Sequence, residues 1–264
     1  MTGPPALDAG TLRVATFNIR NGRALDGWNS WPFRRRAVAD TIANLDADLL
    51  GLQEVFAFQL RWLRGRLPGY LDVGAGRGVR GGERCPVLFR AGRARLLDHR
   101  TRWFGEEPDH PGSRLPGARF PRIATVCRLE LVPGGRHLQL ACTHLDERAE
   151  RRRIRSAEQL AGWLDPDLPR IVVGDLNAEP GSPVLAELES AGLRPALPAD
   201  APGGTSHRFS GSREGRRIDH VLVSGHFEVV AASVAHAVVG ERLPSDHWPV
   251  VAELRLTGAG PAGP

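Results

Sequence analysis

The sequence predicts an α/β fold with a large share of strand, and three observations support this class. Helical and strand patterns alternate in the first part of the chain, whereas strand patterns cluster toward its end. Hydrophobic residues make up 41% and charged residues 25% of the 264 residues, which is an ordinary globular balance. No apolar run approaches the roughly 18 residues of a membrane-spanning helix.

The N-terminal part of the chain alternates strands with helices. Residues 1–10 are rich in proline and glycine, so we expect a disordered segment before a strand at residues 11–19. Apolar residues recur at helical spacing within residues 33–45, and the near-continuous apolar run at residues 48–53 is typical of a strand covered on both faces. A second helix is predicted over residues 55–67, before a Pro-Gly pair.

The remainder of the chain is dominated by strands. They are predicted at residues 86–90, 122–131, 137–143, 169–173, 217–223, 228–236 and 249–256. An apolar face over residues 154–164 predicts a helix whose preceding arginine run faces solvent, and a shorter helix is expected at residues 184–191. Loops at the rim of a site are expected at residues 74–82, 103–120 and 203–215. A flexible tail is expected at residues 257–264.

Charge and cysteine content narrow the class of protein. The formal net charge is +5, but all 35 basic residues are arginine, which is typical of GC-rich coding and weakens the case for a polyanionic partner. Three scattered cysteines do not indicate a disulfide framework or a zinc cluster. The N-terminus lacks the basic start and apolar run of a secretory signal. We therefore expect a cytoplasmic protein without membrane contact.

Polar side chains occur where predicted strands end or begin. They are Asn18, Glu54, His144, Asp175 with Asn177, and Asp246 with His247, while Asp219 lies inside the predicted strand at residues 217–223. Because strand termini present side chains to a cleft, these groups can converge on one site. Each alone also has a local explanation, such as an Asx turn at Asp175 or a cap at Asp246. Their joint occurrence is what indicates a functional site.

Six motifs occur in a fixed order along the chain: FNIR, LQEV, THLD, GDLN, RIDHVLV and SDHWPV. They resemble motifs of the endonuclease/exonuclease/phosphatase superfamily. The resemblance spans residues 11–256, which we expect to form one domain. Within the superfamily, the chain is similar in outline to the deadenylase-like members. It implies a four-layer α/β/β/α sandwich, with two packed mixed sheets and outer helices. It also implies a metal-dependent phosphoric ester hydrolase.

The resemblance implies a divalent metal site. Glu54 matches the main metal-ligand carboxylate of the superfamily, with Asn18 and Asp246 nearby. Oxygen ligands at a partly hydrated site suit Mg²⁺ or Mn²⁺, and such an ion polarises a phosphoryl oxygen.

The same resemblance implies catalytic roles for the other motif residues. Asp175 matches the residue that orients or deprotonates the attacking water, and Asn177 would hold a phosphate oxygen or that water. His247 matches the histidine that stabilises the pentacovalent phosphorus, with Asp219 orienting its ring. His144 matches a second histidine that contacts the phosphate.

Two further residues are less firmly aligned with the superfamily. Glu83 would be the carboxylate partner of His144 or a group on the metal side. Arg122 matches an arginine near the site, although a structural ion pair explains it equally well. Arg34, Arg35, Arg36 and Arg122 are the first candidates for phosphate contacts.

The expected reaction is in-line attack of an activated water on a phosphoester. A phosphodiester is the expected substrate, because the motif set resembles the deadenylase-like members. Single-stranded nucleic acid or a nucleotide-derived compound is favoured over a duplex, because the insertions that grip a duplex are missing and the net charge is only +5. A phosphomonoesterase acting on a small phosphorylated metabolite is the alternative. A catalytically inactive binding domain is a third hypothesis, which the presence of all the matched groups disfavours. Protein partners are not predicted.

Overall fold

The structure is a computed structural model that describes residues 10–236, 238 and 242–257. The segment expected to be disordered and the expected tail therefore lie outside the described residues, apart from Gly10 and Thr257. Thr257 donates hydrogen bonds from its backbone N–H and its hydroxyl to the carbonyl of His226. No helix of the described ranges is long and apolar enough to cross a membrane.

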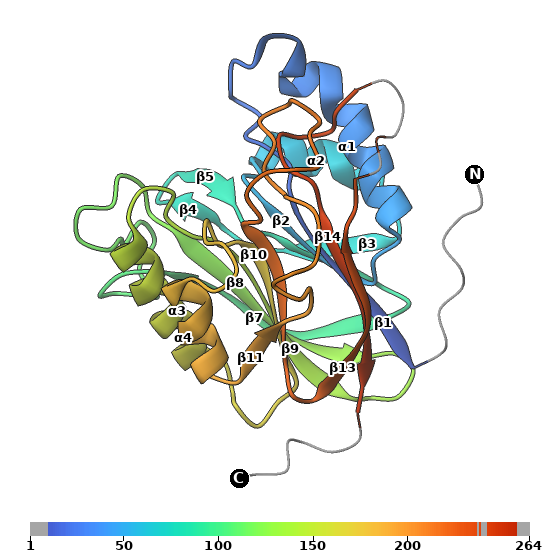
Figure 1. Cartoon of the computed structure of the whole chain (residues 1–264), viewed down its shortest axis with the longest axis vertical. Helices are drawn as coiled ribbons and strands as arrows, with labels where there is room; N and C mark the ends of the chain where they lie inside the picture. Colours follow the sequence, from blue (N-terminus) through green and yellow to red (C-terminus); the bar gives the residue numbers. More distant parts are fainter. Residues whose placement is uncertain (1–9, 237, 239–241, 258–264) are drawn as a thin grey trace.

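Two mixed six-stranded sheets form the centre of the molecule (Figure 1). The first has the order β13-β14-β1-β2-β6-β3 and comprises β1 (Thr11–Asn18), β2 (Leu49–Gln53), β3 (Tyr70–Val73), β6 (Val87–Arg90), β13 (Phe227–Val234) and β14 (Val250–Leu256). The second has the order β11-β12-β10-β9-β8-β7 and comprises β7 (Ala94–Trp103), β8 (Ile123–Leu131), β9 (His137–His144), β10 (Arg170–Asp175), β11 (Leu193–Pro195) and β12 (Asp219–Ser224). A separate hairpin joins β4 (Gly76–Gly78) to β5 (Gly81–Arg84).

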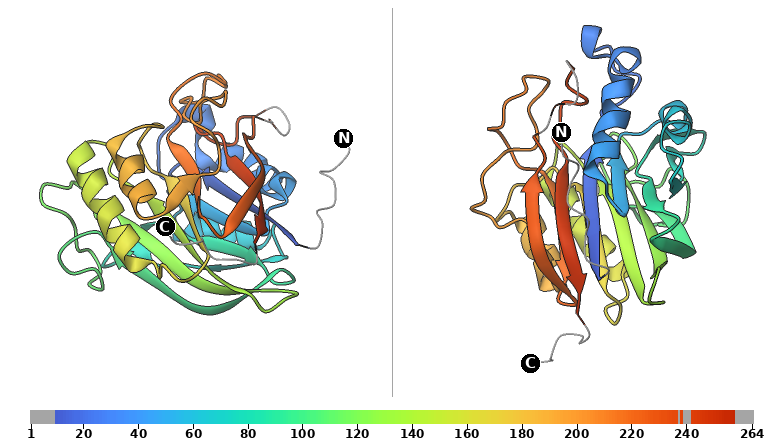
Figure 2. Two further views of the ribbon diagram at one scale, coloured as in Figure 1. Left: turned by 60° about the horizontal axis from the view of Figure 1, so that its bottom comes forward. Right: turned by 90° about the vertical axis from the view of Figure 1, so that its right-hand side faces the viewer.

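Helices cover the outer faces of both sheets (Figure 2). The helices on the first sheet are α1 (Trp31–Leu45) and α2 (Ala57–Arg64), after a short 3₁₀ turn η1 (Gly27–Asn29), and those on the second are α3 (Glu150–Trp163) and α4 (Pro183–Ser190). Three hydrophobic clusters fill the spaces: one between the sheets, one under α1 and α2, and one under α3 and α4. The predicted four-layer sandwich is therefore confirmed.

Five strands escape the sequence-based prediction, namely β3, β4, β5, β7 and β11. The middle of β7 is largely exposed, so its sequence contains no apolar run. β4 and β5 lie in the glycine-rich segment expected to be a loop. α2 ends at Arg64, three residues before the predicted end at Leu67.

The topology brings the motif residues to one end of the sandwich. Each sheet contains one parallel pair, β1 with β2 and β9 with β10, and candidate side chains lie at the carboxyl ends of these strands. β12 and β14 run antiparallel to β10 and β1, so their beginnings lie at the same end. Gly51 of β2 permits close approach of the sheets, since a Cβ there would lie 2.3 Å from a methyl carbon of Val173.

Asp146 of the THLD motif organises the turn that leads into α3. Its Oδ1 accepts hydrogen bonds from the backbone N–H groups of Arg148 and Ala149, and its Oδ2 accepts one from Nε of Arg152. Burial alone would raise the pKa of Asp146, but these donors lower it. The prediction that the arginine run at the start of α3 faces solvent is wrong for two residues. Arg152 donates to the Asp146 carboxylate, and Arg153 donates to the Asp146 backbone carbonyl.

Replacing Asp146 by alanine should lower the free energy of unfolding by about 1–3 kcal/mol at pH 7, because it removes buried hydrogen bonds to a charged group. The folded pKa lies below the unfolded value of about 3.9, so this stabilisation is complete above that value and is lost as the pH falls through the folded pKa. Urea denaturation of both proteins at neutral and acid pH measures the difference. A difference that does not shrink in acid would contradict this account.

Candidate active site

Asn18 joins the two sheets at the candidate site. Its side chain is fully buried, and its Nδ2 donates hydrogen bonds to Oε1 of Glu54 at 3.1 Å and to Oδ2 of Asp175 at 3.0 Å. Glu54 follows β2 of the first sheet, whereas Asp175 ends β10 of the second. One amide therefore holds carboxylates from both sheets together.

Glu54 adopts an uncommon backbone conformation, with a φ of 62°. Its Oε2 accepts a hydrogen bond from the backbone N–H of Asn21 at 2.8 Å. Asn177 also lies in the left-handed region, with a φ of 49°. Residues other than glycine seldom adopt this conformation, and those that do concentrate at functional sites. Sequence analysis missed Asn21, because a single amide after the FNIR motif has no pattern.

His247 and Asp219 form a buried pair. Nδ1 of His247 donates to Oδ2 of Asp219 at 2.8 Å, and Oδ2 of Asp175 lies 4.0 Å from the same nitrogen. Burial alone would lower the pKa of His247, but the charge and hydrogen bond of Asp219 raise it to about 10, with help from Asp175 and Asp246. The ring is therefore positively charged at neutral pH and can donate a charge-assisted hydrogen bond.

The Asp175 carboxyl group titrates close to neutral pH. Burial, assisted by the charge of Asp219, raises its pKa to about 7, although His247 and hydrogen bonds from Asn177 and Asn18 oppose the shift. A carboxyl group with this pKa can accept a proton from water at physiological pH.

His144 faces the same carboxyl group. Its Nε2 lies 3.5 Å from Oδ2 of Asp175. Burial, and then the charges of Arg122, Arg77 and His247, lower the pKa of His144 well below its usual value. The ring is therefore neutral and can donate or accept a hydrogen bond.

Asp246 is tied to the end of β1. The hydroxyl of Ser245 donates to the Asn18 carbonyl at 2.6 Å and lies 3.2 Å from Oδ1 of Asp246. Arg20 reaches Oδ2 of Asp246 at 3.5 Å, while its guanidinium group makes two hydrogen bonds to Asp26. The structure thus places Asp246 beside Asn18.

The donor atoms at this end fit a hard divalent cation. Glu54, Asn18 and Asp246 offer oxygen atoms, and Oδ1 of Asn18 accepts one backbone hydrogen bond, which leaves it a second lone pair. A second cluster of potential ligands, Asp175, Asp219 and His247, lies within 4.8 Å. There, however, Nδ1 of His247 already donates its proton to Asp219. We therefore place the candidate cation on the Glu54 side.

Among the described residues, Glu83 is held by Asn21 and Arg77 and not by His144. Its Oε1 accepts a hydrogen bond from Nδ2 of Asn21 at 2.7 Å, and its Oε2 lies 2.7 Å from Nη1 of Arg77. It lines a narrow recess together with Glu54 and His144. Of its two expected roles, the contact with Asn21 agrees with a group on the metal side.

Two arginines are expected as groups near the site, and the structure agrees with the prediction for Arg122 but not for Arg34. Arg122 lines the same recess and forms an ion pair with Glu147, which places it near the site and in an ion pair at once. The expectation that Arg34 contacts phosphate is wrong, because its side chain is almost fully buried. Its guanidinium group donates instead to the backbone carbonyls of Ile19, Arg20, Asn29 and Pro244.

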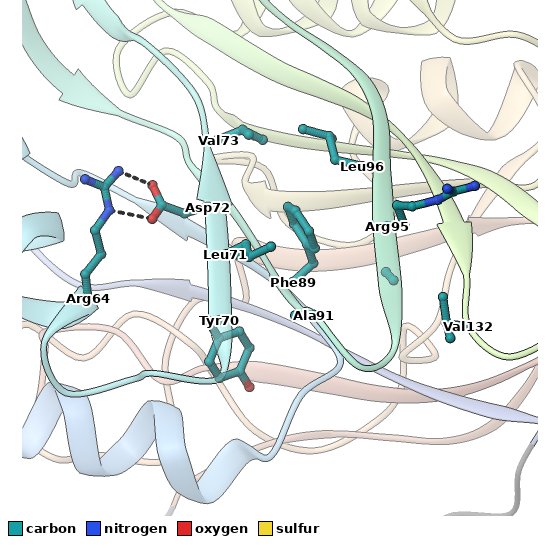
Figure 3. Close-up of a pocket in the computed structure, with 11 residues that line it drawn as sticks. Arg64, Tyr70, Leu71, Asp72, Val73, Phe89, Ala91, Arg95, Leu96 and Val132 are labelled. Atoms are coloured by element: carbon teal, nitrogen blue, oxygen red, sulfur yellow. Dashed lines mark hydrogen bonds and ion pairs between the residues drawn. The ribbon is translucent and has the colours of Figure 1, made fainter.

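A larger cavity of about 810 Å³ lies between the edge strands β3 and β7 (Figure 3). Apolar side chains such as Leu71, Phe89 and Leu96 line it, and its charged residues include the paired Arg64 and Asp72. None of the predicted site residues lines this cavity. A paired guanidinium and carboxylate offer no nucleophile or free base, so we place the chemistry at the strand ends.

The four-layer sandwich with polar side chains at its strand ends is the architecture of a family of phosphoester hydrolases. Residues 15–247 match the family model of the Endonuclease/Exonuclease/phosphatase family, and the chain therefore belongs to this family. No curated protein matched the sequence.

Several solved structures resemble the chain over most of its length. An endonuclease/exonuclease/phosphatase family protein from Bacteroides thetaiotaomicron is 29% identical, with a TM-score of 0.87 over 93% of this chain and 98% of that chain. A mannosyl-6-phosphatase from the same species is 30% identical, with a TM-score of 0.83 over 92% of this chain and 99% of that chain. The human Nocturnin catalytic domain shares the fold at 24% identity, with a TM-score of 0.74 over 94% of this chain and 95% of that chain.

Replacing Asp219 by asparagine should lower the pKa of His247 from about 10 toward its ordinary value of about 6.5, because burial would then act without the main opposing charge. Titration of the imidazole nitrogens by NMR measures this pKa in both proteins. The surface variant Glu228→Gln serves as a control that should leave the value unchanged. A pKa that stays near 10 in Asp219→Asn would contradict the assigned pairing.

Proposed function

We propose that the chain is a divalent-metal-dependent phosphoester hydrolase that acts by in-line attack of water. The observation that carries the proposal is the Asn18 amide, which holds the metal-side carboxylate of Glu54 next to the near-neutral carboxyl group of Asp175. A bound Mg²⁺ or Mn²⁺ ion would be held by Glu54, Asn18 and Asp246 and would polarise a phosphoryl oxygen.

The residues of the chain supply the proton transfer and the charge stabilisation. Asp175 takes the proton of the attacking water, whose oxygen bonds to phosphorus as the bond to the ester oxygen breaks. Asn177 orients that water. The protonated ring of His247, held by Asp219, donates a hydrogen bond to the phosphoryl oxygen as negative charge accumulates. The neutral ring of His144 contacts the phosphate, and solvent protonates the departing oxygen.

Two substrate classes belong to the proposal. The motifs favour a phosphodiester in single-stranded nucleic acid or a nucleotide-derived compound, handled in the cytoplasm without membrane contact. A phosphomonoester of a small metabolite is the second candidate, and the 30% identity to a mannosyl-6-phosphatase favours it. The burial of Arg34 also favours the second class, because it removes one expected contact to a polyanion.

Chelation should abolish hydrolysis, and added Mg²⁺ or Mn²⁺ should restore it. Glu54→Gln should weaken Mn²⁺ binding by about tenfold or more, because it removes the principal anionic ligand. Calorimetric titration of Mn²⁺ into Glu54→Gln and into the surface control Glu228→Gln measures this loss independently of turnover. Full activity in excess chelator, or equal Mn²⁺ affinity in the two variants, would show that the metal role is misplaced.

A direct comparison of substrates tests the two classes. A single-stranded RNA oligomer, a duplex of the same length and a sugar phosphate are offered at matched concentrations with Mg²⁺. We expect the single strand or the monoester to be preferred over the duplex. The Michaelis constant for the oligomer should rise only gently with salt, because few phosphates are contacted. Clear preference for the duplex, with a steep salt dependence, is the contrary result.

A further inference from the structure

Two arginines from separate parts of the chain lie beside His144. Arg77 belongs to β4, Arg122 directly precedes β8, and both line the recess that contains Glu54 and His144. After burial, the charges of Arg122 and Arg77 are the next largest causes that lower the pKa of His144. Both guanidinium groups therefore lie within electrostatic range of the ring that is proposed to contact phosphate.

The guanidinium group of Arg77 is held in place on two sides. Its Nη1 lies 2.7 Å from Oε2 of Glu83, and the guanidinium carbon lies 4.6 Å from the centre of the Phe120 ring. Glu83 is anchored in turn by the side-chain amide of Asn21. Because the Arg77 side chain is only 14% exposed, its geometry is set before a substrate binds.

Arg77 and Arg122 line the same recess, and each is paired with one carboxylate, Glu83 and Glu147 respectively. Burial, and then the charge of Arg122, work against the favourable charge of Glu83 and lower the pKa of Arg77. The charge of Arg122 disfavours the charged form of Arg77, and an anion bound between the two groups would offset this effect. A guanidinium group presents five N–H donors in a planar fork that matches phosphate oxygens, so one carboxylate does not exhaust it.

We infer that Arg77 and Arg122 form a subsite for the doubly charged terminal phosphoryl group of a phosphomonoester, which the enzyme hydrolyses in preference to a phosphodiester. The inference rests on the proposed function and decides between its two substrate classes. A monoester dianion has one more negative charge and one more terminal oxygen than a diester. A second guanidinium group therefore stabilises the monoester selectively.

The test compares p-nitrophenyl phosphate with bis(p-nitrophenyl) phosphate, which share a leaving group and differ in charge. In Arg77→Gln, kcat/KM for the monoester should fall roughly tenfold to a hundredfold, the scale for losing charged hydrogen bonds. For the diester, kcat/KM should change by less than about threefold on the same scale. Arg122→Gln should show the same selective loss, and Arg77→Lys, which keeps the charge but not the fork, a smaller one. Arg80→Gln, an exposed arginine of the same hairpin, is the matched control and should leave both values unchanged.

A binding measurement supports the kinetics. The inhibition constant of inorganic phosphate should rise in Arg77→Gln by about the same factor as the monoester loss, while in Arg80→Gln it should stay near the wild-type value. Equal losses on the two esters, an unchanged phosphate inhibition constant, or a wild-type preference for the diester would overturn the subsite. Failure of the wild type to hydrolyse either ester would instead overturn the proposed function.

Discussion

The side-chain amide of Asn18 is the interaction on which the candidate site depends. It is fully buried between the sheets and donates to carboxylates on both, Glu54 after β2 and Asp175 at the end of β10. A buried amide that loses an acceptor costs about 1–3 kcal/mol, so the amide opposes any sliding of one sheet across the other. Close packing of Gly51 against Val173 restricts the same movement from within the core.

This constraint concentrates negative charge at one end of the sandwich. Glu54, Asp175, Asp219 and Asp246 all converge there, and their mutual repulsion must be offset. The protonated ring of His247 offsets part of it and is held by Asp219, which also helps to raise the pKa of Asp175. The divalent cation that we propose on the Glu54 side would offset the remainder. The same electrostatics would thus shape both the proposed proton acceptor and the proposed cation site.

Much of the fold, and the placement of polar residues at strand ends, can be predicted from the sequence for a physical reason. Strand ends were identifiable because buried strands such as β2 and β10 are apolar runs that stop at a polar residue, and parallel pairing brings such ends together. β7 was missed because its middle is exposed, and Asn21 and Arg77 because their roles depend on contacts with distant residues. The predicted phosphate contact of Arg34 is wrong because its guanidinium group binds four backbone carbonyls, which the sequence does not reveal.

If Asn18 joins the proposed cation side and proton side, the carboxylates of Glu54 and Asp175 act as a single unit. A double-mutant cycle on kcat, with Glu54→Gln, Asp175→Asn and the combined variant, tests it most directly. Mutations of residues that act as a unit have strongly non-additive effects on kcat. The combined variant should therefore be little slower than the slower single variant. The losses in kcat are converted to activation free energies for this comparison. If the two single-variant values add up to that of the combined variant within about 0.5 kcal/mol, the two carboxylates act independently, which would contradict the account.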